Sequence, residues 1–95
     1  MANPKALEKV LESSRYLLRK QDFHGEDLSG ADLTGVYLYG ADLSYCDLTN
    51  TDLSHANLKY ANLCNANLTG AKMEKTRMNF ARLAGAIMPD GKSID

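Results

Sequence analysis

The chain has 95 residues, enough for one small domain, and its 44% apolar and 24% charged residues are typical of a soluble folded protein. A net charge of −1 disfavours both a globally basic nucleic-acid-binding protein and a strongly acidic protein. No apolar run approaches the roughly 20 residues that cross a bilayer, and the N-terminus has no apolar signal core, so we expect a cytoplasmic protein.

Residues 1–20 are predicted to form an N-terminal capping helix. Asn3 and Pro4 are typical of a helix start. Apolar residues then recur at helical spacing, at Leu7, Val10, Leu11, Leu17 and Leu18. We expect a helix over residues 4–19 that lies across the first turn of the following domain. The alternative is a partner-binding or membrane-surface helix, and its mixed charges disfavour the membrane.

Residues 21–88 repeat with a period of five. The fourteen large apolar residues at this spacing form the predicted core: Phe23, Leu28, Leu33, Leu38, Leu43, Leu48, Leu53, Leu58, Leu63, Leu68, Met73, Met78, Leu83 and Met88. A small residue stands two places before most of them, and Asp or Asn often lies between. A period of five fits neither a helix nor a flat strand. We therefore expect each unit to be one short side of a coil, with Gly or Asn at the corner that follows.

Runs such as Ala31-Asp32-Leu33-Thr34-Gly35 and Ala66-Asn67-Leu68-Thr69-Gly70 resemble the pentapeptide-repeat family. The ending around Gly85-Ala86-Ile87-Met88-Pro89 resembles small cyanobacterial members. The resemblance implies an all-β fold, a right-handed four-sided parallel β-helix of about 3.5 coils with an N-terminal α-helical cap. Residues 20 apart would then stack, which places Asp32, Asp52 and Lys72 in one column and Phe23, Leu43, Leu63 and Leu83 in another.

Residues 89–95 are predicted to be a C-terminal tail, because Pro89 and Asp90-Gly91 mark a turn and too few residues follow for a helix. The last coil would then be partly open. Since exposed strand edges are usually covered or paired, we expect the tail or a second molecule to cover it. A homodimer, or stacking through the C-terminal coil, is the corresponding partner hypothesis.

Charge is distributed unevenly along the repeat. Residues 21–58 hold seven acids and no Lys or Arg, whereas residues 59–88 hold five bases and one acid. This distribution either balances a repetitive surface or makes a polar rod suited to oriented docking. Tyr60 and Phe80 would stack below Gly40 at one corner, as a packing ladder or as a protein contact. The candidate interaction residues are Asp32, Asp52, Lys72, Arg77, Arg82, Tyr60 and Phe80.

The sequence offers no catalytic, cofactor-binding or metal-binding residues. His24 and His55 fall on different sides of the coil without ligand neighbours. Cys46 takes a small inward position and Cys64 an outward one, which disfavours a disulfide. Catalysis would need a nucleophile beside a base or paired carboxylates in a cleft, and the pattern predicts neither. We therefore expect a protein that is not an enzyme.

The predicted function is a non-enzymatic protein-interaction or scaffold module with an unknown protein partner. The alternative is a DNA-mimicking inhibitor of a type II topoisomerase, because some members of the resembled family inhibit DNA gyrase in this way. A rod of about 17 Å would have to match about ten duplex charges. Here seven acids are spread around four sides and the C-terminal half is basic, which disfavours mimicry. Direct nucleic-acid binding is disfavoured because the five bases lie on separate sides.

Overall fold

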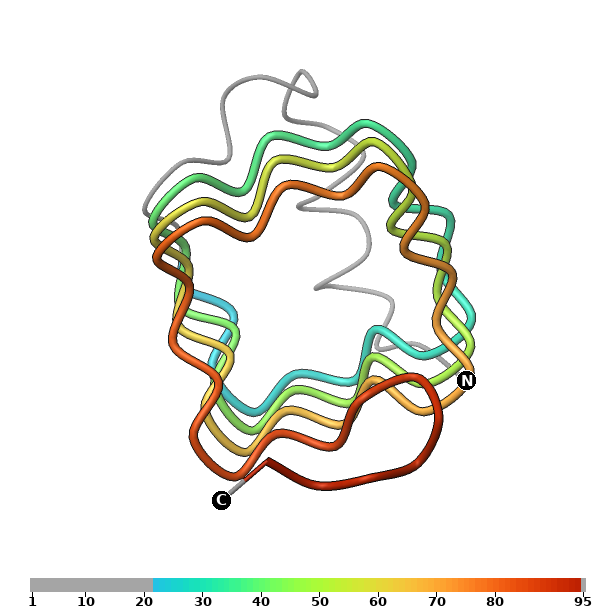
Figure 1. Cartoon of the computed structure of the whole chain (residues 1–95), viewed down its shortest axis with the longest axis vertical. Helices are drawn as coiled ribbons and strands as arrows, with labels where there is room; N and C mark the ends of the chain where they lie inside the picture. The colour runs from blue at the N-terminus through green and yellow to red at the C-terminus, as the bar shows by residue number, and fades with distance from the viewer. Residues whose placement is uncertain (1–21, 95) are drawn as a thin grey trace.

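The computed structural model describes residues 22–94, which wind into stacked coils with a four-sided outline (Figure 1). Residues 20 apart lie side by side in parallel, as in the bridges Asp32↔Asp52 and Asp52↔Lys72. Within the described residues these contacts are single bridges, and neither a helix nor an extended strand occurs. The 69 residues from 22 to 90, at 20 per coil, give about three and a half coils.

The four sides of the coil are named here by their central apolar residues. Face A contains Phe23, Leu43, Leu63 and Leu83, and face B contains Leu28, Leu48, Leu68 and Met88. Face C contains Leu33, Leu53 and Met73, and face D contains Leu38, Leu58 and Met78. Successive coils add one side to each face, so each face is a column of stacked short segments.

Main-chain hydrogen bonds join each coil to the next on every face. On face B, the Leu48 amide donates to the Asn67 carbonyl at 2.8 Å, and the Asn67 amide donates back to the Cys46 carbonyl at 3.0 Å. The same pair of bonds recurs on the other faces. Each inner coil is thus bonded on both sides, and only the terminal coils can leave backbone groups without partners.

Each corner is a tight turn that needs a left-handed residue. In the turn after Leu28, the Ala31 amide donates to the Leu28 carbonyl at 3.2 Å and Gly30 has a φ of 71°. This is the pattern of a type II turn. Seven corners carry other residues at φ of 57–64°, namely Tyr45, Asn50, His55, Tyr60, Asn65, Lys75 and Phe80. A residue with a β-carbon costs about 1–2 kcal/mol in this left-handed region of φ and ψ. Some other interaction must therefore offset the cost of the side chains at these corners.

The interior of the coil is a continuous apolar column. Ten of the fourteen predicted core residues, Phe23 through Leu68, are at most 1% exposed. Polar atoms at the small inward positions donate to main-chain carbonyls. Cys46 Sγ donates to the Phe23 carbonyl at 2.8 Å, and Thr51 Oγ1 donates to the Leu48 carbonyl at 2.8 Å. Such residues replace Ala in the core without leaving a buried donor unpaired.

Where Asp or Asn precedes the central residue, its side chain stabilises the following turn. Asp32 Oδ1 accepts a hydrogen bond from the Thr34 amide at 3.0 Å, and Asn62 Oδ1 accepts one from the Cys64 amide at 3.0 Å. Where Ser or Thr follows, its hydroxyl often donates to the same oxygen, as Thr69 does to Asn67 at 2.6 Å. Asp and Asn are interchangeable here because both supply an acceptor oxygen.

The core residues of the C-terminal coil are less completely buried than those of the coils above it. Met73, Met78, Leu83 and Met88 are only partly buried, because no further coil covers them among the described residues. The tail turns back and pairs antiparallel with one side only, through the bridge Ile87↔Ser93. Gly85 and Met88 donate to the carbonyls of Ile94 and Lys92 at 2.6 and 2.8 Å. The predicted N-terminal helix lies outside the described residues.

Candidate interaction surface

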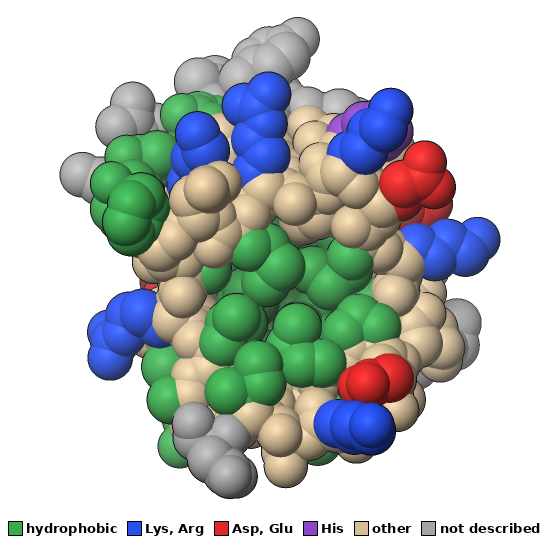
Figure 2. All heavy atoms as spheres, in the orientation of Figure 1, with side chains coloured by type: hydrophobic (Ala, Val, Ile, Leu, Met, Phe, Trp, Pro, Cys, Tyr) green, Lys and Arg blue, Asp and Glu red, His purple; other side chains and the backbone are tan. Residues whose placement is uncertain are grey.

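The C-terminal end of the coil exposes an apolar centre surrounded by charged side chains (Figure 2). The end of the core column contributes the partly buried side chains of Met73, Met78, Ala81, Leu83 and Met88. We call this surface the open end. This surface is apolar because the inward-pointing positions of the last coil still carry apolar residues.

The backbone of the open end forms a sheet edge. In the coil above, the amides of Leu53, Leu58 and Leu63 donate to carbonyls of the next coil at 2.7 Å. Within residues 22–94 the equivalent amides of the last coil, at Met73, Lys75, Met78, Phe80 and Leu83, have no acceptor. Faces C and D therefore end in an unpaired edge, and face A is covered only at Gly85. Such an edge is a template for pairing with another chain.

The three bases predicted as interaction residues, Lys72, Arg77 and Arg82, lie at this edge together with Lys75. Lys72, Lys75, Arg77 and Arg82, here called the basic belt, lie on faces C, D and A of the last coil. Parallel backbone β-bridges pair Lys72 with Asp52, Arg77 with Asn57 and Arg82 with Asn62. Glu74 is the single acid between residues 71 and 85. The structure thus brings Lys72, Arg77 and Arg82 together at one end.

Asp52 and Asp32 occupy the same face as Lys72. Asp52 lies one coil farther from the open end than Lys72, and Asp32 lies two coils farther. Both carboxylates accept hydrogen bonds from their own turns, from the Thr34 and Ser54 amides at 3.0 Å. The hydrogen bonds from Ser54 and the neighbouring charge of Lys72 hold the pKa of Asp52 below its usual value. The vertical charge columns predicted from the sequence are confirmed, while these two acids have a local structural role.

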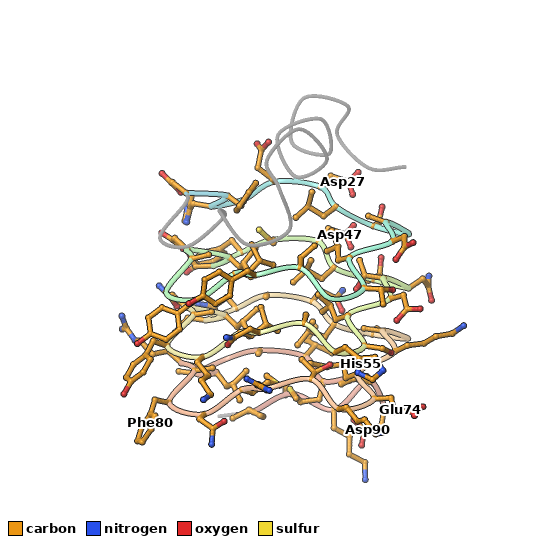
Figure 3. All side chains as sticks on the ribbon, turned by 90° about the horizontal axis from the view of Figure 1, so that it is seen from above. Asp27, Asp47, His55, Glu74, Phe80 and Asp90 are labelled. Atoms are coloured by element: carbon orange, nitrogen blue, oxygen red, sulfur yellow. The ribbon has the colours of Figure 1, made fainter. Side chains whose placement is uncertain are left out.

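Four aromatic rings form a continuous column beside the belt. Ring centroids are 6.0 Å apart between Tyr37 and Tyr39, 5.3 Å between Tyr39 and Tyr60, and 5.1 Å between Tyr60 and Phe80. The last pair is stacked with an interplanar angle of 15°. Phe80 ends the column at the open end, where it is 74% exposed (Figure 3). The stack is a ladder between coils, and its final ring also presents a surface.

Sequence reasoning missed two features of this region. Tyr39 joins the column through its ring contact with Tyr60 in the next coil, a consequence of side-chain direction that the repeat pattern does not encode. On face A, His24 Nδ1 lies 2.6 Å from Ser44 Oγ, whose hydroxyl donates to Asp42 Oδ1 at 2.5 Å. Ser44 is buried between the acid and the imidazole, so this cluster is a structural link rather than an activated nucleophile.

The remaining chemistry of the described residues is sparse. Within residues 22–94 no group of three His, Cys, Asp or Glu side chains is arranged to hold a metal ion. No helix in that range is long and apolar enough to cross a bilayer. Cys46 and Cys64 are both free thiols, and burial raises the pKa of Cys46 to about 12. The open end, the basic belt and the aromatic column together form the candidate interaction surface.

Solved structures resemble this fold. HetL, a pentapeptide-repeat protein of Nostoc involved in regulation of heterocyst differentiation, is 36% identical with a TM-score of 0.58. The match covers 81% of this chain and 42% of HetL, so the chain spans less than half of that protein. A pentapeptide-repeat protein of the Arabidopsis thaliana thylakoid lumen is 31% identical over 99% of this chain and 77% of its own, with a TM-score of 0.63.

A second Nostoc pentapeptide-repeat protein is 26% identical, with a TM-score of 0.53 and coverage of 92% and 75% of the two chains. No curated protein matches the sequence. The family model for pentapeptide repeats matches residues 18–50 and 51–88 with eight copies. Proteins of this family fold as right-handed, four-sided β-helices, and the four-sided stacked coils of this chain agree with that fold. The chain belongs to the pentapeptide-repeat family.

Proposed function

We propose that this protein is a non-enzymatic interaction module that binds a protein partner at its open end. The unpaired edge of the last coil carries the proposal. A repeat protein that buries its core by stacking needs a cap at each end. Here the tail caps one face, while the amides of Met73 and Met78 and the adjoining apolar surface have no cover among the described residues.

The family and the surface both support a module without catalysis. Pentapeptide-repeat proteins are commonly non-enzymatic repeat proteins. HetL takes part in a regulatory process, and we propose the same class of role, regulation by contact, for this chain. Edge pairing, apolar burial and a charged rim are the ordinary components of a protein interface.

DNA mimicry has less support. Seven acids lie in residues 21–58, and several, including Asp27, Asp42 and Asp47, use a carboxylate oxygen to hold their own turn. Three columns begin with Asp: those of faces A and C end in Arg82 and Lys72, and that of face B ends in Ile87. A surface that changes sign along its length does not reproduce the uniform charge of a duplex, which is about one per 1.7 Å.

Site-specific photocrosslinking in the source cells tests the proposal. Phe80 is replaced by p-benzoylphenylalanine in one variant, and Tyr45 is replaced by it in the control. Both positions carry exposed aromatic rings at left-handed corners, 74% and 61% exposed with φ of 62° and 60°. They differ in that Phe80 lies at the open end, whereas Tyr45 lies on an inner coil.

We expect a discrete protein adduct from position 80 that is absent or much weaker from position 45. An adduct at twice the mass of the chain would identify a second copy as the partner and would still place the interface at the open end. Equal adducts from both positions, or none from position 80, would contradict docking at this end.

A further inference from the structure

We infer that the occupant of the open end is an acidic segment of a different protein that adds one more side to face D. The segment places an acid beside Arg77, an apolar residue over Met78 and an aromatic ring on Phe80. This inference rests on the proposed function, since it names the partner chemistry of the same surface.

The backbone of face D defines what the segment must supply. In the side above, the amides of Leu58 and Tyr60 donate to the carbonyls of Arg77 and Asn79 at 2.7 and 3.1 Å, and the Ala56 carbonyl accepts from the Arg77 amide at 2.9 Å. Within residues 22–94, the amides of Met78 and Phe80 and the Thr76 carbonyl lack these partners. A short extended segment with two carbonyls and one amide at this spacing completes the pattern.

The chain itself shows that an edge of the last coil can pair with an added short segment. On face B, across the coil from face D, the tail lies antiparallel to residues 85–88, with the Ile94 amide donating to the Ala86 carbonyl at 2.7 Å and the Met88 amide donating to the Lys92 carbonyl at 2.8 Å. Three residues of extended backbone are therefore sufficient to pair with one side. The tail does not reach face D, which remains available to another chain.

The positive charge around face D of the last coil favours an acidic segment as the binding partner. Residues 76–85, which form face D and face A of the last coil, contain Arg77 and Arg82 and no acid. Lys75 adds a third base at the preceding corner. Two open ends placed face to face would bring two basic belts together, and like-charge juxtaposition opposes that arrangement. An acid beside Arg77 reproduces the arrangement on face C, where Asp52 lies beside Lys72.

The exposed ring of Phe80 favours a partner segment that carries an aromatic residue at the adjoining corner. Phe80 occupies a left-handed corner at φ 62°, where the first coil has Gly40 at φ 69°. One face of its ring stacks on Tyr60, and the ring is still 74% exposed. A ring at the equivalent position of an added side would continue the column at the same spacing. The recognised pattern is therefore acid, apolar, any residue, aromatic, in parallel orientation.

The segment Asp42-Leu43-Ser44-Tyr45 of this chain has that pattern and provides a probe. A synthetic peptide of residues 41–50 with Cys46→Ala is titrated into the full-length ¹⁵N-labelled protein, and amide shifts are recorded. We expect saturable shifts centred on Arg77, Met78 and Phe80. Asp42→Lys or Tyr45→Ala in the peptide should weaken binding at least about threefold. Higher salt should weaken the unmodified peptide as well.

Phe80→Gly in the protein removes the ring and leaves a residue suited to the corner, so the fold is retained while peptide binding weakens. Tyr45→Gly is the matched control and should bind the peptide normally. Absence of shifts, shifts centred on another face, or equal binding of the Asp42→Lys peptide would overturn the inference. If the photocrosslink from position 80 persists in that case, docking at the open end stands and only the partner chemistry is wrong.

Discussion

The side-chain amide of Asn50 occupies the space where Gly70, one coil below, lacks a β-carbon. A β-carbon at position 70 would overlap Asn50 Oδ1 and lie 3.3 Å from Asn50 Cγ. Gly85 has the same relationship to Asn65. These two glycines have a left-handed φ, and a β-carbon at either would also displace the Asn side chain 20 positions earlier.

Gly70→Ala should destabilise the protein more than Gly35→Ala. Both glycines have left-handed φ, of 74° and 70°, so each substitution carries a backbone cost of about 1–2 kcal/mol. Within residues 22–94, a β-carbon at Gly35 meets no atom inside 4 Å, so only Gly70→Ala adds an overlap. Urea unfolding of the two variants measures the difference in free energy of unfolding.

The overlap can be isolated with a double-mutant cycle. Asn50→Gly removes the side chain above position 70 and retains a residue suited to that corner. In the Asn50→Gly background, Gly70→Ala should cost about as much as Gly35→Ala. An unchanged difference between the two glycines in that background would show that the Asn50 amide is not its cause.

Acid should destabilise the fold through its turn carboxylates. Hydrogen bonds from the Ser44 hydroxyl and amide hold the pKa of Asp42 below its usual value, and equivalent bonds from Ser29 and Ser54 lower the pKa of Asp27 and Asp52. A carboxyl with a lowered folded-state pKa stabilises the fold fully above its unfolded-state pKa of about 3.9. That contribution is lost as the pH falls through the unfolded-state pKa toward the lowered folded-state pKa.

Asp42→Asn should reduce this acid sensitivity without breaking the turn. In the next coil, Asn62 Oδ1 accepts the equivalent hydrogen bond from the Cys64 amide, so an Asn at this position can hold the turn. The urea midpoint of the variant should fall less between pH 7 and pH 3 than that of the wild type. Ser44→Ala provides the complementary control, since it should lower the midpoint at pH 7 more than at pH 3. Equal falls for wild type and Asp42→Asn would refute the linkage.

The period of five predicted most of the fold, because inward residues such as Leu48 and Leu63 recur without interruption and must share one interior. The columns of charge followed directly from 20 residues per coil. Contacts that depend on side-chain direction could not be predicted, such as Tyr39 crossing to Tyr60 or Asn50 filling the space above Gly70. The short tail predicted an open end. Which face the tail covers could not be predicted, because the geometry of the turn before Ser93 determines where the tail pairs.

The two thiols should react at very different rates. Cys46 is 1% exposed, its Sγ donates to the Phe23 carbonyl, and burial raises its pKa to about 12. At pH 8 its thiolate fraction is then about one in ten thousand. Cys64 is partly exposed. Iodoacetamide labelling followed by mass spectrometry should modify Cys64 first and Cys46 only when urea unfolds the chain. Comparable rates in native buffer would contradict the buried position of Cys46.

A charge in the middle of the core should prevent folding, whereas the same charge at the open end should not. Leu48 is fully buried between Leu28 and Leu68 on face B, so the ammonium group of Leu48→Lys would enter the interior without a partner. We expect a loss of more than about 4 kcal/mol, which is most of the stability of a small domain. Met73 is partly buried in the last coil, and the ammonium group of Met73→Lys can reach water from the open end.

Circular dichroism and thermal melting of the two Lys variants, beside Asp47→Asn, measure this contrast. Asp47→Asn should melt near the wild type, because Asn67 holds the equivalent turn one coil below with the same bonds from Thr69. A cooperative melt of Leu48→Lys close to that of Met73→Lys would mean that the column is not sealed at position 48. A large loss for Asp47→Asn would instead show that the acidic column contributes through its charge rather than through its acceptor oxygen.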